Sequence, residues 1–165
     1  MIARLFLFVS AAGFAASALV HLATFTPAAS RLGEGVVLVL FALAFAPLSA
    51  MLARLRRAAP TRQWRRLRVY DWRAVAALVP GGPRVLVAAT GLYVVMNLGL
   101  SLLLVAGESV SAEEHRAVTL RLLSGHLLLF YLLPLVYFRF VDPRRGALGA
   151  AASAPAHPIQ GGTAP

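Results

Sequence analysis

The chain lacks cysteine and lysine, and only 6 of its 165 residues are acidic. The absence of cysteine excludes disulfides, thiolate metal sites and cysteine nucleophiles. Charged residues make up 13% of the chain and hydrophobic residues 59%. Because soluble domains carry about 25% charged residues, this composition predicts a membrane protein.

Motifs of catalysis and nucleotide binding are also missing from the sequence. It contains no Walker motif, dinucleotide fingerprint or other phosphate-binding glycine loop. The run Ser124–Gly125–His126 does not form a catalytic dyad by itself, because side chains two residues apart on a helix diverge by about 200°. We therefore expect a protein that is not an enzyme.

Four apolar blocks are each long enough to cross a bilayer, for which about 20 residues suffice. None of them alternates with the period of two that is typical of a strand. The expected fold class is all-α, a four-helix transmembrane bundle of a multi-pass membrane protein within residues 1–145. The predicted helices cover residues 2–25, 34–55, 85–107 and 117–138.

Two segments at the ends of the chain require separate treatment. The first block follows Arg4 and resembles a signal peptide, but its apolar run from Leu5 to Phe25 has 21 residues. The core of a signal peptide has roughly 7–15 residues, so we favour a retained helix over a cleaved one. Residues 146–165 are rich in Ala, Gly and Pro and are expected to form a disordered tail.

Arginine is concentrated on one side of the predicted bundle. If the chain makes four crossings, 13 of its 16 arginines lie on the side of the two chain ends and of the segment 56–84. The positive-inside rule assigns this side to the cytoplasm. The prediction is a bacterial-type cytoplasmic (inner) membrane protein with both termini in the cytoplasm.

The loop 56–84 mixes arginine with aromatic residues, a composition typical of a segment at the membrane interface. We expect it to contact anionic lipid headgroups rather than nucleic acid. Its expected headgroup contacts are Arg56, Arg57, Arg62, Trp64, Arg65, Arg66, Arg68, Trp72 and Arg73.

Polar residues form a stripe along the third block. At 100° per residue, Thr90, Tyr93, Asn97, Ser101 and Glu108 fall within about 80° of one another. Hydroxyl and amide groups in a membrane require hydrogen-bond partners. This face is therefore expected to point into the bundle.

The first block repeats this pattern with Ser10, Ser17, His21 and Thr24, and Gly13 lies beside the stripe. Small residues allow two helix backbones to approach closely, and hydroxyls bond across helices. The two stripes are interpreted as packing faces.

A polar network is expected near the centre of the membrane. Asn97 and His126 lie about 15 Å and about 13 Å from the outer ends of their helices, so we predict a hydrogen bond between them. Arg121 lies one turn below the outer end of its helix and can extend to the headgroups. The predicted network consists of Tyr93, Asn97, Ser101, Arg121 and His126.

Three functions remain open on sequence alone. The favoured one is an accessory, scaffold or interaction subunit that binds another membrane protein or a second copy of itself and needs no cofactor or metal. The alternative is a b-type cytochrome in which His21 and His126 ligate haem iron from both sides. A small transporter or channel subunit is the third, although the predicted helices show no inverted repeat and no Asp or Glu lies within the hydrocarbon region to couple protons.

Overall fold

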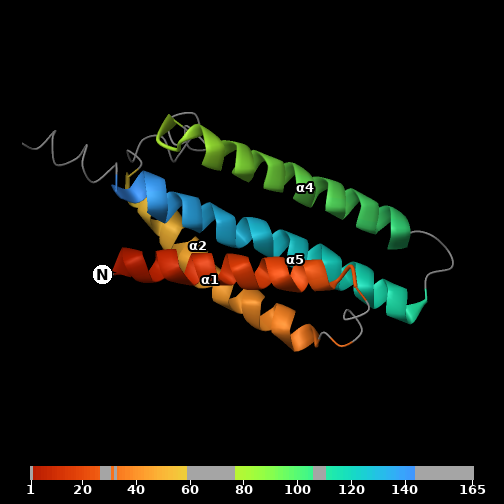
Figure 1. Cartoon of the computed structure of the whole chain (residues 1–165). Coiled ribbons are helices and arrows are strands. Elements are labelled where there is room, and N and C mark those ends of the chain that lie inside the picture. The colour runs from red at the N-terminus through yellow and green to blue at the C-terminus, as the bar shows by residue number, and fades with distance from the viewer. Residues whose placement is uncertain (1, 27–30, 32, 59–76, 106–110, 144–165) are drawn as a thin grey trace, which may run out of the picture.

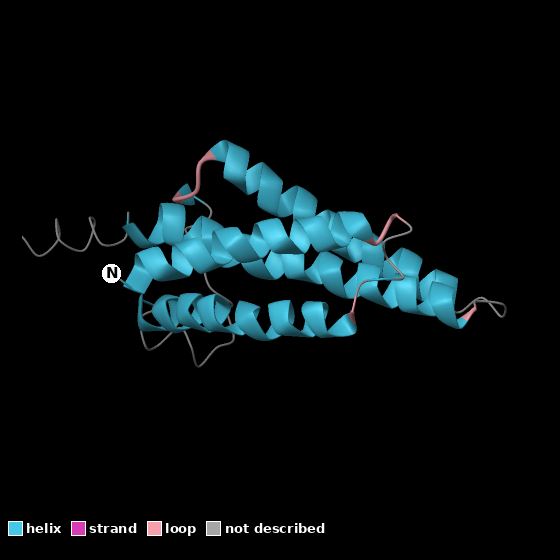
Figure 2. Cartoon of the chain, turned by 60° about the horizontal axis from the view of Figure 1, so that its bottom comes forward, coloured by secondary structure: helices cyan, strands magenta, loops and turns pink. Residues whose placement is uncertain are grey.

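The computed structural model describes residues 2–26, 31, 33–58, 77–105 and 111–143. Figure 2 shows helices joined by loops throughout this part of the chain, and no strand occurs in it. The elements are α1 (Ile2–Ala23), α2 (Glu34–Ala58), α4 (Gly81–Val105), α5 (Ala112–Val136) and the π-helical extension η3 (Tyr137–Val141).

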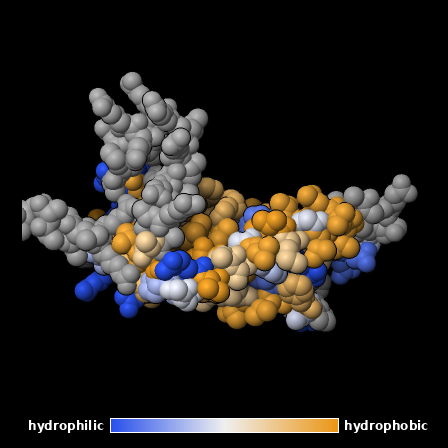
Figure 3. All heavy atoms as spheres, turned by 90° about the horizontal axis from the view of Figure 1, so that it is seen from above, coloured by the Kyte–Doolittle hydropathy of each residue, from blue (hydrophilic) through white to orange (hydrophobic). Residues whose placement is uncertain are grey.

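Four of these helices are long and apolar enough to cross a membrane. Hydrophobic side chains cover most of the face seen in Figure 3, and hydrophilic residues gather toward the ends of the bundle. The prediction of an all-helical, four-helix transmembrane bundle is confirmed.

Helix α5 lies at the centre of the arrangement. It packs against α1, α2 and α4, and α1 and α2 also pack against each other (Figure 1). By contrast, α4 makes extensive contact with only one other described helix, α5. Leu120, Leu127, Tyr131 and Leu132 of α5 are each at most 1% exposed, because neighbours cover several sides of this helix.

Two helices begin earlier than predicted. α5 begins at Ala112 instead of residue 117, because Ser111 forms a capping box with Glu114. The Ser111 hydroxyl accepts from the backbone N–H of Glu114, while the Glu114 carboxylate accepts from the backbone N–H of Ser111. This reciprocal pair satisfies two N–H groups that otherwise have no helical partner.

α4 begins at Gly81 instead of the predicted residue 85, so residues 81–84 belong to the helix and not to the loop before it. Proline is tolerated in the first helical turn because N–H groups there have no intrahelical acceptor. Pro83 occupies such a position, and the N–H of Arg84 donates to the carbonyl of Pro80 at 3.2 Å.

An ion pair joins two helices at each end of the bundle. Arg54 of α2 pairs with Asp142 after η3, at the end where the described arginines are concentrated. At the opposite end, Arg116 Nε of α5 lies 3.4 Å from a carboxylate oxygen of Glu34 of α2. Of the predicted headgroup contacts, Arg56 and Arg57 are exposed at the end of α2. Residues 62–73 of the loop and the predicted tail lie outside the described residues.

Candidate functional site: a buried polar network

The side chain of His21 connects three helices. It projects from the last turn of α1 and is only 6% exposed. Its Nδ1 lies 2.8 Å from the hydroxyl oxygen of Ser124 on α5. Its Nε2 is hydrogen-bonded to the hydroxyl of Tyr93 on α4. One imidazole therefore links α1, α5 and α4.

The hydrogen-bond partners assign a tautomer to this imidazole. The Ser124 hydroxyl donates to the backbone carbonyl of Arg121 at 3.2 Å, so its oxygen is free to accept from Nδ1–H of His21. The unprotonated Nε2 then accepts from the Tyr93 hydroxyl. Each of these groups is satisfied by a neutral imidazole, which avoids placing a charge inside the bundle.

Asn97 and Arg121 extend this network. Asn97 Nδ2 on α4 donates to the carbonyl of Arg121 at 3.2 Å. The Arg121 side chain turns toward α1, where Nη2 donates to the carbonyl of Thr24 at 3.3 Å. Its guanidinium also lies 4.2 Å from the ring centroid of Phe25. A cation at the C-terminus of a helix is stabilised by the helix dipole, so Arg121 acts as a cap for α1.

The helices can approach this closely because residue 125 is glycine. A Cβ atom added at Gly125 would lie 2.6 Å from Asn97 Nδ2 and 3.5 Å from His21 Cε1. The first of these distances is shorter than van der Waals contact. Gly125 therefore provides the space that the Asn97 amide of α4 occupies against α5.

The residues of the two predicted packing faces differ in how far they are buried. The buried residues of α1 are Ser10, Gly13, Ser17 and His21, with Thr24 buried just beyond the helix. On α4, Asn97 and Ser101 are buried at 6% and 4% exposure, and Tyr93 is partly exposed at 37%. Glu108 lies outside the described residues.

The predicted hydrogen bond between Asn97 and His126 was wrong. Asn97 donates to the Arg121 carbonyl, and His126 Nδ1 lies 2.8 Å from the carbonyl of Leu122 in its own helix. The reason is the rotation of α5, which turns Gly125 toward α4. Three of the five predicted network residues, Tyr93, Asn97 and Arg121, lie together around the Ser124–His21 pair. Ser101 is buried further along α4, and His126 lies apart.

His21 and His126 do not form a facing pair of ligands in this arrangement. His21 bonds to Ser124, and the side chain two residues later on the same helix points about 200° away from Ser124. A haem between the two rings would require His21 to exchange a hydrogen bond for iron and His126 to leave the Leu122 carbonyl. The haem hypothesis stays a prediction, and the geometry of the described residues gives it no support.

Sequence reasoning missed the pairing of Ser124 with His21. A serine beside an imidazole is a pattern of nucleophilic catalysis. Ser124, however, is completely buried, and neither residue lines the cavities at the two ends of the bundle. The pair is therefore interpreted as a bridge between helices.

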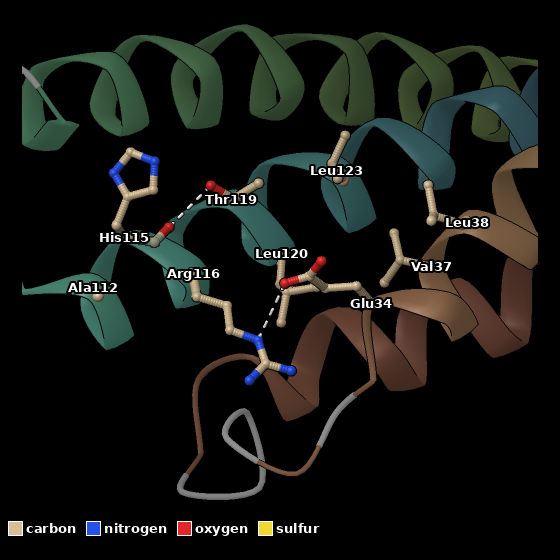
Figure 4. Close-up of a pocket in the computed structure, with 9 residues that line it drawn as sticks. All are labelled: Glu34, Val37, Leu38, Ala112, His115, Arg116, Thr119, Leu120 and Leu123. Carbon is tan, nitrogen blue, oxygen red and sulfur yellow. Dashed lines mark hydrogen bonds and ion pairs between the residues drawn. The ribbon is translucent and has the colours of Figure 1, made fainter.

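A cavity of about 340 Å³ lies between the beginnings of α2 and α5 (Figure 4). It contains the Arg116–Glu34 ion pair, and the Thr119 hydroxyl donates to the carbonyl of His115 at 2.9 Å. Figure 4 shows the His115 ring on the side of its helix away from that ion pair. No group of three or more His, Asp or Glu side chains suited to a metal occurs among the described residues.

Comparison of the chain with protein-family models, curated proteins and solved structures gives no match. Its function is therefore argued from its own residues.

We expect His21 and Ser124 to be energetically coupled. His21→Leu and Ser124→Ala should each lower the free energy of unfolding in micelles by about 0.6–1.7 kcal/mol, the range for hydrogen bonds in membranes. The loss in free energy of unfolding of the double variant should be smaller than the sum of the two single losses, because both single changes break the same bond. Asn97→Leu and His126→Leu serve as the matched control. Their effects on the free energy of unfolding should be additive. Additive effects for His21 and Ser124 would contradict the assigned bridge.

Proposed function

We propose that this multi-pass membrane protein is a non-enzymatic accessory or interaction subunit of a bacterial-type cytoplasmic membrane. The observation that carries the proposal is the use of the buried polar groups. His21, Tyr93, Asn97, Arg121 and Ser124 bond to one another and to backbone carbonyls. Groups engaged in this way hold helices together, whereas a reaction centre needs groups that face a substrate cavity.

The outer face of α4 is the proposed surface for a partner. Among the described helices, α4 packs extensively only against α5, and it exposes large apolar side chains, among them Leu92, Val95 and Leu103 at 63%, 66% and 73%. Apolar lipid chains can cover such a face, but helix association in membranes depends on side-chain packing. A helix packed on one side gains further contacts from a helix of a partner protein or of a second copy.

Support for the orientation comes from the charges at the two ends. Arg54, Arg56, Arg57, Arg84 and Arg139 lie at the end that contains the N-terminus of α1 and the C-terminus of α2 (Figure 1). The other end contains Glu34, Glu113 and Glu114. The positive-inside rule favours a cytoplasmic location for the arginine-rich end.

Haem binding and transport are less well supported. Both nitrogens of His21 already have partners, and the polar stripe of α4 packs against α5 instead of lining a passage. We expect the purified protein to lack a cofactor.

The chain contains no cysteine, so single introduced cysteines can test the proposal in native membranes. A benzophenone maleimide attached at Val95→Cys should cross-link to a protein, because this position is proposed to face a partner. The matched position Phe8→Cys on α1 is similarly exposed, at 71% against 66% for Val95, and should yield lipid adducts only. Lipid adducts alone at Val95 would contradict the interaction role.

Two further single-cysteine variants test the orientation. In intact cells, a membrane-impermeant maleimide should label Glu113→Cys and leave Arg57→Cys unlabelled. The reverse pattern would overturn the proposed orientation without affecting the cross-linking result.

A further inference from the structure

An apolar groove of about 500 Å³ opens between α2, α4 and the end of α5. It exists because α4 packs on α5 and stands away from α2 at this end of the bundle. Its lining includes Met51 and Leu55 of α2, Val85 and Ala88 of α4, and Leu133 of α5.

The groove runs along the bundle from the arginine-rich end toward the middle of the membrane. Its lining on the last helical segment extends from Val141 to Leu133. Eight residues of helix correspond to about 12 Å along the axis. This direction is that of a lipid acyl chain in the adjacent leaflet.

Arg84 is the only charged side chain among the described residues that line the groove. Arg84 is exposed, and its Nε donates to the carbonyl of Val79 at 3.0 Å, which restrains the guanidinium beside the groove. No ion pair to Arg84 is present among the described residues, whereas Arg54 and Arg116 have carboxylate partners. A fixed arginine above an apolar groove is complementary to a phosphate attached to an acyl chain.

We propose that this groove binds one anionic phospholipid, with an acyl chain between α2 and α4 and the headgroup phosphate paired with Arg84. The inference depends on the protein lying in a membrane and is independent of its role as an interaction subunit. Basic pockets between membrane helices are a general means of binding anionic headgroups. Lipid in the groove would fill the space that separates α4 from α2.

The test uses the full chain in mild detergent, with phosphatidylglycerol or phosphatidylcholine of identical acyl chains as the probe. Native mass spectrometry and the thermal midpoint report binding. Phosphatidylglycerol should bind one molecule per chain and raise the midpoint more than phosphatidylcholine does. Arg84→Gln should weaken its binding about fivefold, the effect of one arginine near an anionic lipid surface, and Arg84→Lys should restore most of it.

Arg139→Gln is the matched control, because Arg139 is an exposed arginine at the same end but outside the groove lining. It should bind phosphatidylglycerol as the unmodified chain does. Ala88→Phe places a ring in the groove and should reduce binding of both lipids. Helical content measured by circular dichroism separates this effect from misfolding.

Three outcomes would overturn the proposal: equal binding of the two lipids, equal weakening by Arg84→Gln and Arg139→Gln, or undiminished binding in a folded Ala88→Phe variant. A shift from monomer to dimer on lipid removal would assign the groove to a second copy instead. None of these four results would alter the cross-linking expected at Val95. Failure of the lipid site and failure of the proposed function are therefore distinguishable.

Discussion

Replacing Tyr131 by alanine should lower the free energy of unfolding by about 3–5 kcal/mol, the range for removal of a buried aromatic ring. Tyr131 on α5 is 1% exposed, and its ring packs directly over Gly13 of α1. Its hydroxyl donates to the carbonyl of Leu40 on α2 at 2.6 Å. Loss of the ring therefore removes packing between three helices, and packing is a principal source of helix association in membranes.

Tyr131→Phe separates the hydrogen bond from the ring. It should cost about 0.6–1.7 kcal/mol, because only the bond to the Leu40 carbonyl is lost. Both variants can be measured by reversible unfolding in mixed micelles or by steric trapping. Equal losses for Tyr131→Ala and Tyr131→Phe would show that the ring contributes little and would contradict the packing described.

Gly13→Ala should destabilise the bundle by about 1–3 kcal/mol, the usual cost of overpacking. A Cβ atom at this position would overlap three atoms of the Tyr131 ring. The ring is held by the bond to the Leu40 carbonyl, so it cannot move aside without breaking that bond.

Gly99→Ala is the matched control for this change. Gly99 is also within a membrane-spanning helix, but a Cβ atom there meets nothing within 4 Å. Because glycine within a helix is less stable than alanine by roughly 0.5–1 kcal/mol, this variant should gain stability. The double variant Gly13→Ala/Tyr131→Leu should lose less free energy of unfolding than the two single variants lose in total. A stabilising Gly13→Ala would show that α1 lies farther from α5.

The number of spanning helices and the inward faces of α1 and α4 were predictable from the sequence. Each depends on a pattern summed over many residues, such as the spacing of Ser10, Ser17 and His21. Helix ends were less predictable because they depend on single residues. The Ser111–Glu114 capping box was present as a sequence signal that places the start of α5.

The candidate site was only partly predictable, and α5 explains why. Ser124, Gly125 and Leu127 are all buried although they point in different directions around this helix. A helix covered on several sides has no apolar stripe from which its rotation can be inferred. The sequence therefore indicated His126 as the partner of Asn97, whereas the rotation presents the Arg121 carbonyl and Gly125.

The central position of α5 has a consequence for biogenesis. α1, α2 and α4 precede it in the chain, and α4 has extensive contact with no other helix in the part of the chain that the structure describes. During synthesis, α4 thus enters the bilayer before the helix that holds it has been made. The bundle closes only when α5 is inserted, and at that step the hydroxyl of Ser124 reaches His21 and the guanidinium of Arg121 reaches the end of α1. Assembly of this protein is accordingly a late event, in which the last spanning segment organises those already in the membrane.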